Sequence, residues 1–319
     1  MAVYFLNIKT FGRSGGSSAV SAAAYRAGER IRDERTGRTY DHTDRQDVLH
    51  KEILVPSHLA ASDLGWARDR ARLWNAAEDA EVRKNARVAR EYLVALPAEL
   101  DPVQRLALAR HFSRELTDRY RFVLDLTVHA PRNFPGSDPR NFHAHLLATT
   151  REATCAGLGP KTTLELNDAK RRELGLPSGI HEFLYARERW ATVANDALRD
   201  AHTQARVDHR SLAAQGIDRE PYPHIPRAAY EMERHGYRSA LAERLRSEYQ
   251  QRVQARAERV AAPQPAQPQA LEEIRRQARE EWLRSRQEAA ARSAQPAPAS
   301  AAHQSTAQPG LTGDDPLAR

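Results

Sequence analysis

Three histidines have the residue type and the spacing of a metal-ligand set. His143 and His145 are two residues apart in the apolar segment 142–150, and on a strand that spacing directs both side chains to one face. His129 closes the apolar segment 122–129, so a hairpin between the two strands would bring its imidazole beside the pair. Three imidazoles on one sheet face leave positions at a metal for water or substrate oxygens. Ordinary surface or core histidines are the alternative interpretation.

A tyrosine near the amino terminus has the chemistry of a nucleophile. Tyr25 lies in an Ala-rich segment with Arg26 and Arg30 as cationic neighbours. A phenol oxygen attacks effectively when a cation stabilises the developing charge. The alanines at 22–24 would give the helix a thin surface that another chain could approach. The alternative is a core aromatic, which is common at helical spacing.

Glu91 is the one carboxylate that the pattern singles out. It opens a predicted strand directly after Arg90. In that place a carboxylate can hydrogen bond to a ligand histidine and fix its tautomer. A surface ion pair with Arg90 is the alternative.

The elements that must position these residues have an α+β pattern. Gly and Ser residues at 12–18 form a loop, and Ser17 or Ser18 is suited to cap the helix that follows. Because the last two strands are joined without an obvious helix, we expect an antiparallel sheet flanked by helices. The predicted strands cover 3–10, 91–96, 122–129 and 142–150, and the predicted helices 18–30, 62–87 and 101–119.

The second half of the chain is predicted to be helical and then disordered. Thr162 and Glu165 have the spacing of a capping box. Composition changes near residue 260: residues 261–319 carry seven Pro and equal numbers, seven each, of basic and acidic residues. This change marks a Pro/Ala/Gln-rich tail at 261–319. A Pro-rich joint, EPYPHIPRA, precedes a charged helical extension at 227–260, and the first domain is expected at 1–226. Within them, helices are predicted at 162–205, 228–260 and 271–292, with a disordered end.

Composition excludes several classes of protein. The chain has 319 residues and a formal net charge of +7, and 44 of its 49 basic residues are Arg. Arginine suits phosphate-rich partners because its guanidinium binds phosphate bidentately, although a GC-rich genome would also produce this bias. A single cysteine, Cys155, excludes an intramolecular disulfide framework and a multi-cysteine zinc site. With no 18-residue apolar run and no secretory signal, we expect a soluble cytoplasmic protein without membrane insertion. The segment GLGPKTT lacks the Gly before Lys that a P-loop needs.

Taken together, these segments resemble the MobA/MobL family of plasmid mobilisation relaxases, the Q-type group of the HUH endonucleases. The run SAVSAAAYRAGERIRDERTGRTYDHT is similar to the family's first motif, with Tyr25 in the nucleophile position. VAREYLVALPAEL resembles its second motif, although Leu93 stands where some relatives have another acidic residue. LTVHAPRNFPGSDPRNFHAHLLATTRE resembles its histidine motif, and VDHRSLAAQGIDREPYPHI a segment common after the catalytic sheet. The resemblance covers residues 1–226.

The resemblance implies a nicking endonuclease that acts in conjugation. A divalent cation, Mg²⁺ or Mn²⁺, held by His129, His143 and His145 would bind the scissile phosphate of single-stranded DNA at a transfer origin. Tyr25 would attack it to form a 5′-phosphotyrosyl adduct, with Glu91 in support. DNA-binding contacts are expected from arginines of the motif segments: Arg13, Arg26, Arg30 and Arg151. Accessory mobilisation proteins and a conjugation coupling protein are the expected partners.

Two other functions fit parts of the pattern. A rolling-circle replication initiator of the same superfamily would share the chemistry of Tyr and His-x-His. In many initiators, however, the tyrosine follows the histidines, whereas Tyr25 precedes them here. A non-catalytic DNA-binding accessory protein would have structural histidines and would leave no phosphotyrosine.

Overall fold

A computed structural model describes residues 2–131, 138–261 and 268–293 of the chain. By its internal contacts the chain divides into two compact units, residues 1–218 and residues 219–319. The first unit contains the sheet and every candidate catalytic residue. From the sequence, the end of the first domain was expected at residue 226, and that domain division stays a prediction.

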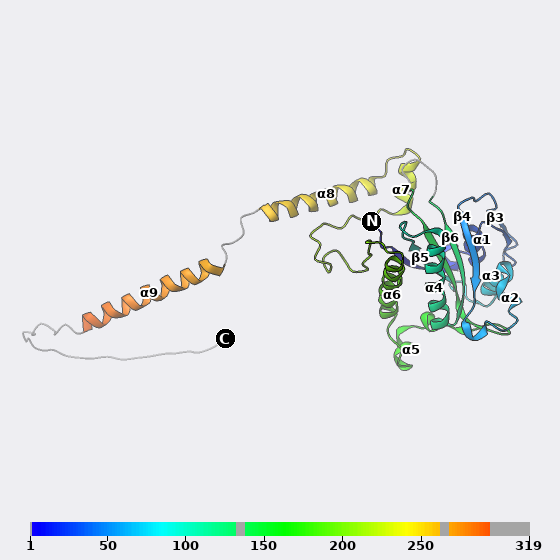
Figure 1. Cartoon of the computed structure of the whole chain (residues 1–319), viewed down its shortest axis with the longest axis horizontal. Coiled ribbons are helices and arrows are strands. Elements are labelled where there is room, and N and C mark those ends of the chain that lie inside the picture. Colours follow the sequence, from blue (N-terminus) through cyan, green and yellow to red (C-terminus); the bar gives the residue numbers. More distant parts are fainter. Residues whose placement is uncertain (1, 132–137, 262–267, 294–319) are drawn as a thin grey trace, which may run out of the picture. The chain divides into compact units, whose positions relative to one another are not determined.

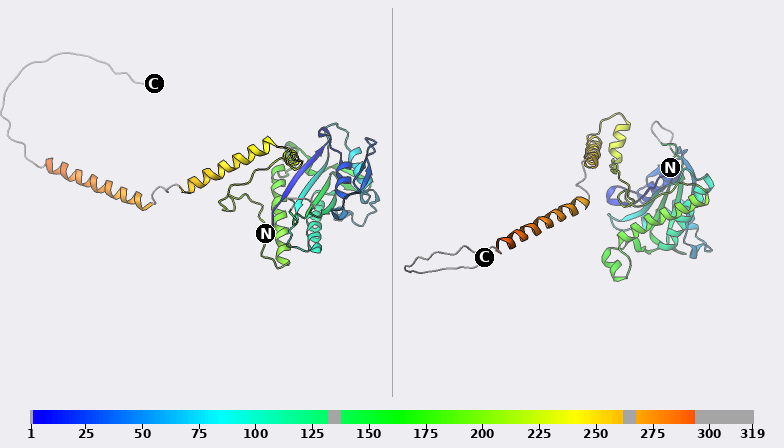
Figure 2. Two further views of the ribbon diagram at one scale, coloured as in Figure 1. Left: turned by 90° about the horizontal axis from the view of Figure 1, so that it is seen from above. Right: turned by 60° about the vertical axis from the view of Figure 1, so that its left-hand side comes forward.

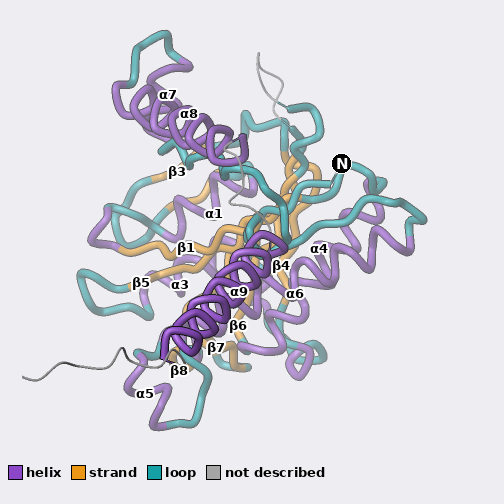
Figure 3. Tube along the Cα trace, turned by 90° about the vertical axis from the view of Figure 1, so that its left-hand side faces the viewer, coloured by secondary structure: helices purple, strands orange, loops and turns teal. Residues whose placement is uncertain are grey.

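The centre of the first unit is a six-stranded sheet in which every pairing is antiparallel. Five strands follow the order β1-β5-β7-β6-β4, and β8 pairs with β7. Figure 3 shows the strands as orange tubes. The expected α+β fold is thereby confirmed. The strands are β1 (Leu6–Gly12), β4 (Val48–Leu54), β5 (Arg87–Ala95), β6 (Phe122–His129), β7 (His143–Thr154) and β8 (Gly157–Lys161).

Helices cover the sheet on both faces (Figures 1 and 2). On one face, α4 (Pro102–Tyr120) and α6 (Gly179–Asp200) pack on a core that includes Phe112 and Trp190. On the other face, α1 (Ala19–Ala27) and α3 (Arg70–Asp79) pack on a second core around Trp74. Strand residues alternate between these cores, so the second face also receives the polar side chains of the candidate site. Two short helices, α2 (Gly65–Arg68) and α5 (Asp168–Glu173), and the hairpin β2 (Arg30–Arg32) and β3 (Thr39–Asp41) complete this unit.

Helix α1 is short because both of its ends are fixed. At the start, the Ser18 side chain accepts a hydrogen bond from the Ser21 amide, as an N-cap does. At the end, Gly28 has a φ of 60° and donates its amide to the carbonyl of Ala24. A side chain at Gly28 would be strained there and would also meet Val48 at 3.3 Å. The last turn, which carries Tyr25, is therefore held in one place.

The described part of the second unit is mainly helical. It contains α7 (Arg227–Arg234), α8 (Ala240–Ala261) and α9 (Pro268–Ser293). Arg246 makes two contacts of 2.7 Å with Glu233, which join α7 to α8. No helix among the described residues is long and apolar enough to span a membrane. The predicted disorder of the tail concerns mainly residues 294–319, which lie outside the described residues.

Several sequence predictions differ from the observed elements. The predicted helix 62–87 is broken at Asp69, which is extended and caps α3 through the Arg72 amide. The predicted helix 162–205 is interrupted around Gly175, whose φ is positive, and helix 228–260 around Gly236 for the same reason. The capping box expected at Thr162 is absent, because that side chain makes no cap hydrogen bond.

Candidate metal and nucleophile site

The β6–β7 pairing brings the three histidines together. His129 lies directly opposite His143 in the antiparallel register, and His145 follows two residues later on the same face. The three ring centroids are 4.8 to 5.3 Å apart. One nitrogen from each ring can be chosen so that all three lie within 4.8 Å of one another. The hairpin predicted from the sequence therefore produces a compact three-imidazole cluster.

The hydrogen bonds of the three imidazole rings show which nitrogen of each ring carries the lone pair. The Nδ1 of His145 donates to Glu91 at 2.7 Å, and the Nδ1 of His143 donates to the Asn141 carbonyl at 3.0 Å. Both rings then have their lone pair on Nε2. The Nε2 of His129 donates to the Arg26 carbonyl at 2.8 Å, which leaves the lone pair of that ring on Nδ1.

Burial keeps two of these imidazoles neutral at pH 7. The pKa of His129 is lowered to about 3, mainly by loss of solvent and to a smaller extent by the neighbouring His145. Burial also lowers the pKa of His145 to about 4, although its hydrogen bond to Glu91 acts in the opposite direction. A metal ion needs the neutral imidazole as its ligand. The donor set therefore fits a cation, and an all-imidazole set is one that transition-metal ions accept more readily than Mg²⁺.

Glu91 lies at the back of the cluster as an ionised carboxylate. Its side chain is fully buried, accepts hydrogen bonds from His145 and Arg26, and pairs with Lys9 at 2.8 Å. Burial alone would raise the pKa of this carboxyl, but the hydrogen bonds from His145 and Arg26 hold it well below its usual range. The tautomer-fixing contact expected from the sequence is therefore present.

Replacing Glu91 with glutamine should lower both stability and metal affinity. Arg26 is only 8% exposed, so loss of its anionic partner should cost about 3 to 5 kcal/mol of unfolding free energy. Loss of the negative charge that His145 contacts should also weaken metal binding about 10- to 100-fold. Urea unfolding and calorimetric Mn²⁺ titration measure the two effects.

Glu165→Gln is the matched control for this substitution. Glu165 is also a buried carboxylate that pairs with an arginine of β5, Arg90, at 2.7 Å. Its hydrogen-bond partners are Arg87 and Arg90, which are not histidines. It should therefore lose stability but keep its Mn²⁺ affinity. Equal Mn²⁺ affinities of Glu91→Gln and the wild type would contradict the role given to Glu91.

Tyr25 is connected to the histidine cluster through Arg26 and Arg45. It is half-buried in the last turn of α1, and the carbonyl of the next residue, Arg26, binds His129. The guanidinium of Arg45 lies 4.3 Å from the centre of the Tyr25 ring and 3.3 Å from the Nδ1 of His129. The tyrosine and the metal-ligand candidates therefore contact one common side chain. The alanines of α1 do not form the exposed surface expected from the sequence, because Ala22, Ala23 and Ala24 are buried.

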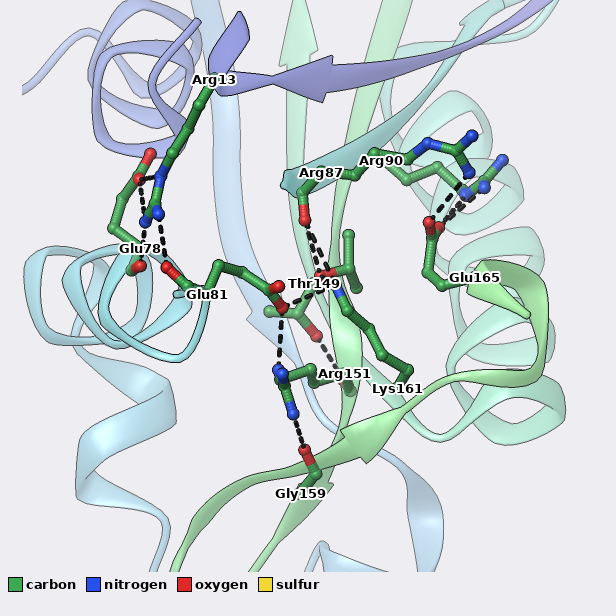
Figure 4. Close-up of polar contacts among 11 residues, drawn as sticks. Arg13, Glu78, Glu81, Arg87, Arg90, Thr149, Arg151, Gly159, Lys161 and Glu165 are labelled. Atoms are coloured by element: carbon green, nitrogen blue, oxygen red, sulfur yellow. Dashed lines mark hydrogen bonds and ion pairs between the residues drawn. The ribbon is translucent and has the colours of Figure 1, made fainter. Parts of the chain in front are cut away.

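The four arginines expected to bind DNA lie in different surroundings. Arg26 is buried against Glu91, whereas Arg30 is 69% exposed, with Asp41 at 3.8 Å. Arg13 and Arg151 belong to a separate polar network, in which Arg13 binds Glu78 and Arg151 binds Glu81 at 2.8 Å (Figure 4). Of the four, Arg30 has the side chain most accessible to a DNA phosphate.

Three residues of the site were not expected from the sequence. His42 packs edge-on against the Tyr25 ring at 5.2 Å, Arg45 stacks on that ring, and Asp47 binds Arg45. All three lie between β3 and β4, and neither strand was predicted. The alternation in β4, which is half-buried along most of its length, was the available signal.

An antiparallel sheet with three clustered histidines and a tyrosine connected to them is the arrangement that the resemblance to the relaxases implies. Comparison with known proteins tests this resemblance. The MobA/MobL family matches residues 17–235, more than half of the chain, so the chain belongs to the MobA/MobL family. The resemblance stated from the sequence is confirmed, and the relaxase interpretation is favoured over both alternatives.

Individual relatives agree with this membership. The mobilization protein MobL of Acidithiobacillus ferridurans is 36% identical over 281 residues, which cover 82% of this chain and 71% of that protein. Mobilization protein A of Escherichia coli is 36% identical over 76% of this chain but 32% of its own length. A solved structure described as "Molecular Basis of Vancomycin Resistance Transfer in Staphylococcus aureus" has a TM-score of 0.53 and 30% identity, and covers 66% of this chain and 100% of that chain.

Proposed function

We propose that this protein nicks one DNA strand at a plasmid transfer origin through Tyr25 and rejoins it after transfer. The Tyr25 oxygen attacks the scissile phosphorus, forming a 5′-phosphotyrosyl bond and breaking the bond to the 3′ oxygen. The phenol proton is lost and the leaving oxygen gains one, giving a free 3′-OH. One phosphodiester replaces another, so the step is close to isoenergetic, and a returning 3′-OH can reverse it.

The protein side chains have distinct parts in this reaction. His129, His143 and His145 would hold a divalent cation, which supplies charge withdrawal from the phosphate oxygens. Glu91 orients His145 and balances the charge of Arg26. The last turn of α1 holds the Tyr25 ring, and a precise approach of nucleophile to phosphorus is a large part of the rate of such reactions.

One observation carries this proposal. His129 binds the carbonyl of Arg26, the residue directly after Tyr25, at 2.8 Å. The nucleophile and the ligand set are therefore joined through a single residue of α1, although His129 and Tyr25 lie more than a hundred residues apart in the sequence.

Covalent trapping tests the proposed function. The protein should be incubated with Mn²⁺ and single-stranded oligonucleotides that span the transfer origin of its own plasmid or genome. A denaturing gel should show a protein–DNA adduct, and peptide mapping should locate the DNA on Tyr25. A protein that binds the oligonucleotide but leaves no adduct would be an accessory DNA-binding protein.

DNA affinity should come mainly from phosphate contacts. The net charge of +7 lies entirely within residues 1–260, and binding through such charges weakens steeply with salt. Accessory mobilisation proteins and a conjugation coupling protein are the proposed protein partners. We assign contacts with them to the region after residue 260, because it has no net charge and contains none of the candidate catalytic residues.

Removal of residues 261–319 should separate catalysis from transfer. A protein of residues 1–260 should form the DNA adduct at nearly the rate of the full chain, because the sheet, α1 and both cores lie before residue 219. Plasmid transfer in cells should fall if the removed region binds a partner. Loss of adduct formation would show that the region belongs to the catalytic fold, and unchanged transfer would remove the reason for assigning it a partner.

A further inference from the structure

Arg45 makes an unusual set of contacts for an arginine in a loop. It lies between β3 and β4, yet its side chain is only 9% exposed. Asp47 holds it in a two-pronged ion pair, with 2.8 Å from Nε to Oδ1 and 2.5 Å from Nη2 to Oδ2. Its Nη1 donates to the Tyr25 carbonyl at 2.7 Å. The guanidinium is thus fixed by a carboxylate and attached to the main chain of the candidate nucleophile.

The same guanidinium fixes the ring of Tyr25. Its carbon lies 4.3 Å from the ring centre, a cation–π distance, while His42 contacts the ring edge-on at 5.2 Å and 89°. Two side chains of one loop therefore restrict the orientation of the tyrosine. Because His42 and Arg45 belong to the same short segment, the ring depends on that segment as well as on α1.

The remaining contact of Arg45 reaches the metal-ligand candidates. Its Nη2 lies 3.3 Å from the Nδ1 of His129. The other nitrogen of that ring donates to the Arg26 carbonyl, so Nδ1 carries the lone pair that a metal would need. A cation in that position competes for the lone pair, and its positive charge also repels a divalent ion.

We propose that Arg45 is a positioning residue that orients Tyr25 for attack and opposes metal binding at His129. This inference rests on the proposed function, since it assigns a part in the same reaction. For His129 to ligate a metal through Nδ1, the Nη2 contact of Arg45 must yield. The hydrogen bond from Nη1 to the Tyr25 carbonyl and the stacking of the guanidinium on the Tyr25 ring can persist. The tyrosine therefore stays oriented when the contact between Nη2 and His129 is lost.

If Arg45 has both roles, one substitution should raise metal affinity and lower the rate of adduct formation. Arg45→Gln removes the competitor and one positive charge, while β6 and the Arg26 carbonyl still hold His129. Affinity for Mn²⁺ should therefore rise severalfold. The same change removes the stacked cation from the Tyr25 ring, so adduct formation at saturating Mn²⁺ and oligonucleotide should slow by about 10- to 100-fold. DNA affinity should change little.

The experiment uses the full chain and three measurements. Calorimetry gives the Mn²⁺ affinity without DNA, rapid-quench single-turnover assays give the rate constant of adduct formation, and fluorescence anisotropy gives oligonucleotide affinity. Arg45→Lys keeps the charge but loses the planar fork, so its Mn²⁺ affinity should stay near that of the wild type while the rate falls. Arg32→Gln, which removes an exposed arginine of the β2–β3 hairpin, controls for the loss of one charge.

The outcomes separate this inference from the proposed function. Absence of a Tyr25 adduct in the wild type would overturn the proposed function itself. With an active wild type, weaker or unchanged Mn²⁺ binding by Arg45→Gln would overturn the opposition to metal, and an unchanged rate would overturn the positioning of Tyr25. If thermal unfolding shows that Arg45→Gln does not fold, Arg45→Lys decides: wild-type rates from that variant would refute the inference.

Discussion

Replacing Tyr25 with phenylalanine should abolish cleavage and adduct formation while DNA affinity stays nearly unchanged. The substitution removes only the attacking oxygen. The aromatic ring between Arg45 and His42 is retained. Affinity for DNA comes mainly from phosphate contacts, to which one phenol adds little. Adduct gels and anisotropy on the same oligonucleotide measure the two properties.

Tyr40→Phe is the control for this result. Tyr40 lies on β3 and pairs with Ile31 of β2, and it is also partly buried. Its replacement should leave the adduct intact. Adduct formation by Tyr25→Phe, or a DNA-linked peptide that contains Tyr40, would show that the nucleophile has been assigned to the wrong residue.

Loss of the cation or of one histidine should have the second large effect. Chelation with EDTA should stop adduct formation, and added Mn²⁺ or Mg²⁺ should restore it. His145→Ala should lower metal affinity and rate together, because it removes one of the three proposed ligands and leaves Glu91 without its histidine contact. Calorimetry and single-turnover assays over a series of metal concentrations measure both.

His111→Ala tests whether the effect is specific to the cluster. His111 is a 60% exposed histidine of α4 that pairs with Glu115, so its loss should change neither metal affinity nor rate. Full activity of the wild type in EDTA, or of a His143→Ala/His145→Ala double variant, would refute the metal site.

The part of the fold that carries the histidines was predictable because its strands are apolar and β-rich. The segment 122–129 is buried at every position, and its hairpin with 142–150 follows from a connection without a helix. Strand β4 was not predicted because its sequence, VLHKEIL, is nearly half polar and most of the strand is only partly buried. Strand β8 was not predicted because Gly and Pro, which are uncommon in strands, occupy three of its five positions.

The residues of the candidate site were predictable where a short stretch of sequence contains the whole pattern. Two histidines on one strand and a tyrosine on one helix are local patterns. Arg45 could not be found in this way, because its significance comes from contacts with Tyr25 and His129, which lie 20 and 84 residues away. Likewise, Arg26 was expected at the DNA, whereas its partner Glu91 is 65 residues distant. Which charges are buried together depends on tertiary packing.

The fixed ends of α1 constrain how this protein can change over generations. Each residue in an α-helix turns the chain by about 100°, so one insertion or deletion between Ser18 and Gly28 would rotate Tyr25 away from Arg45 and His129. Buried positions such as Ala23 accept only small apolar side chains, and these can replace one another there. Among functional descendants, these alanine positions are therefore expected to vary, whereas the length of the segment from Ser18 to Gly28 stays constant.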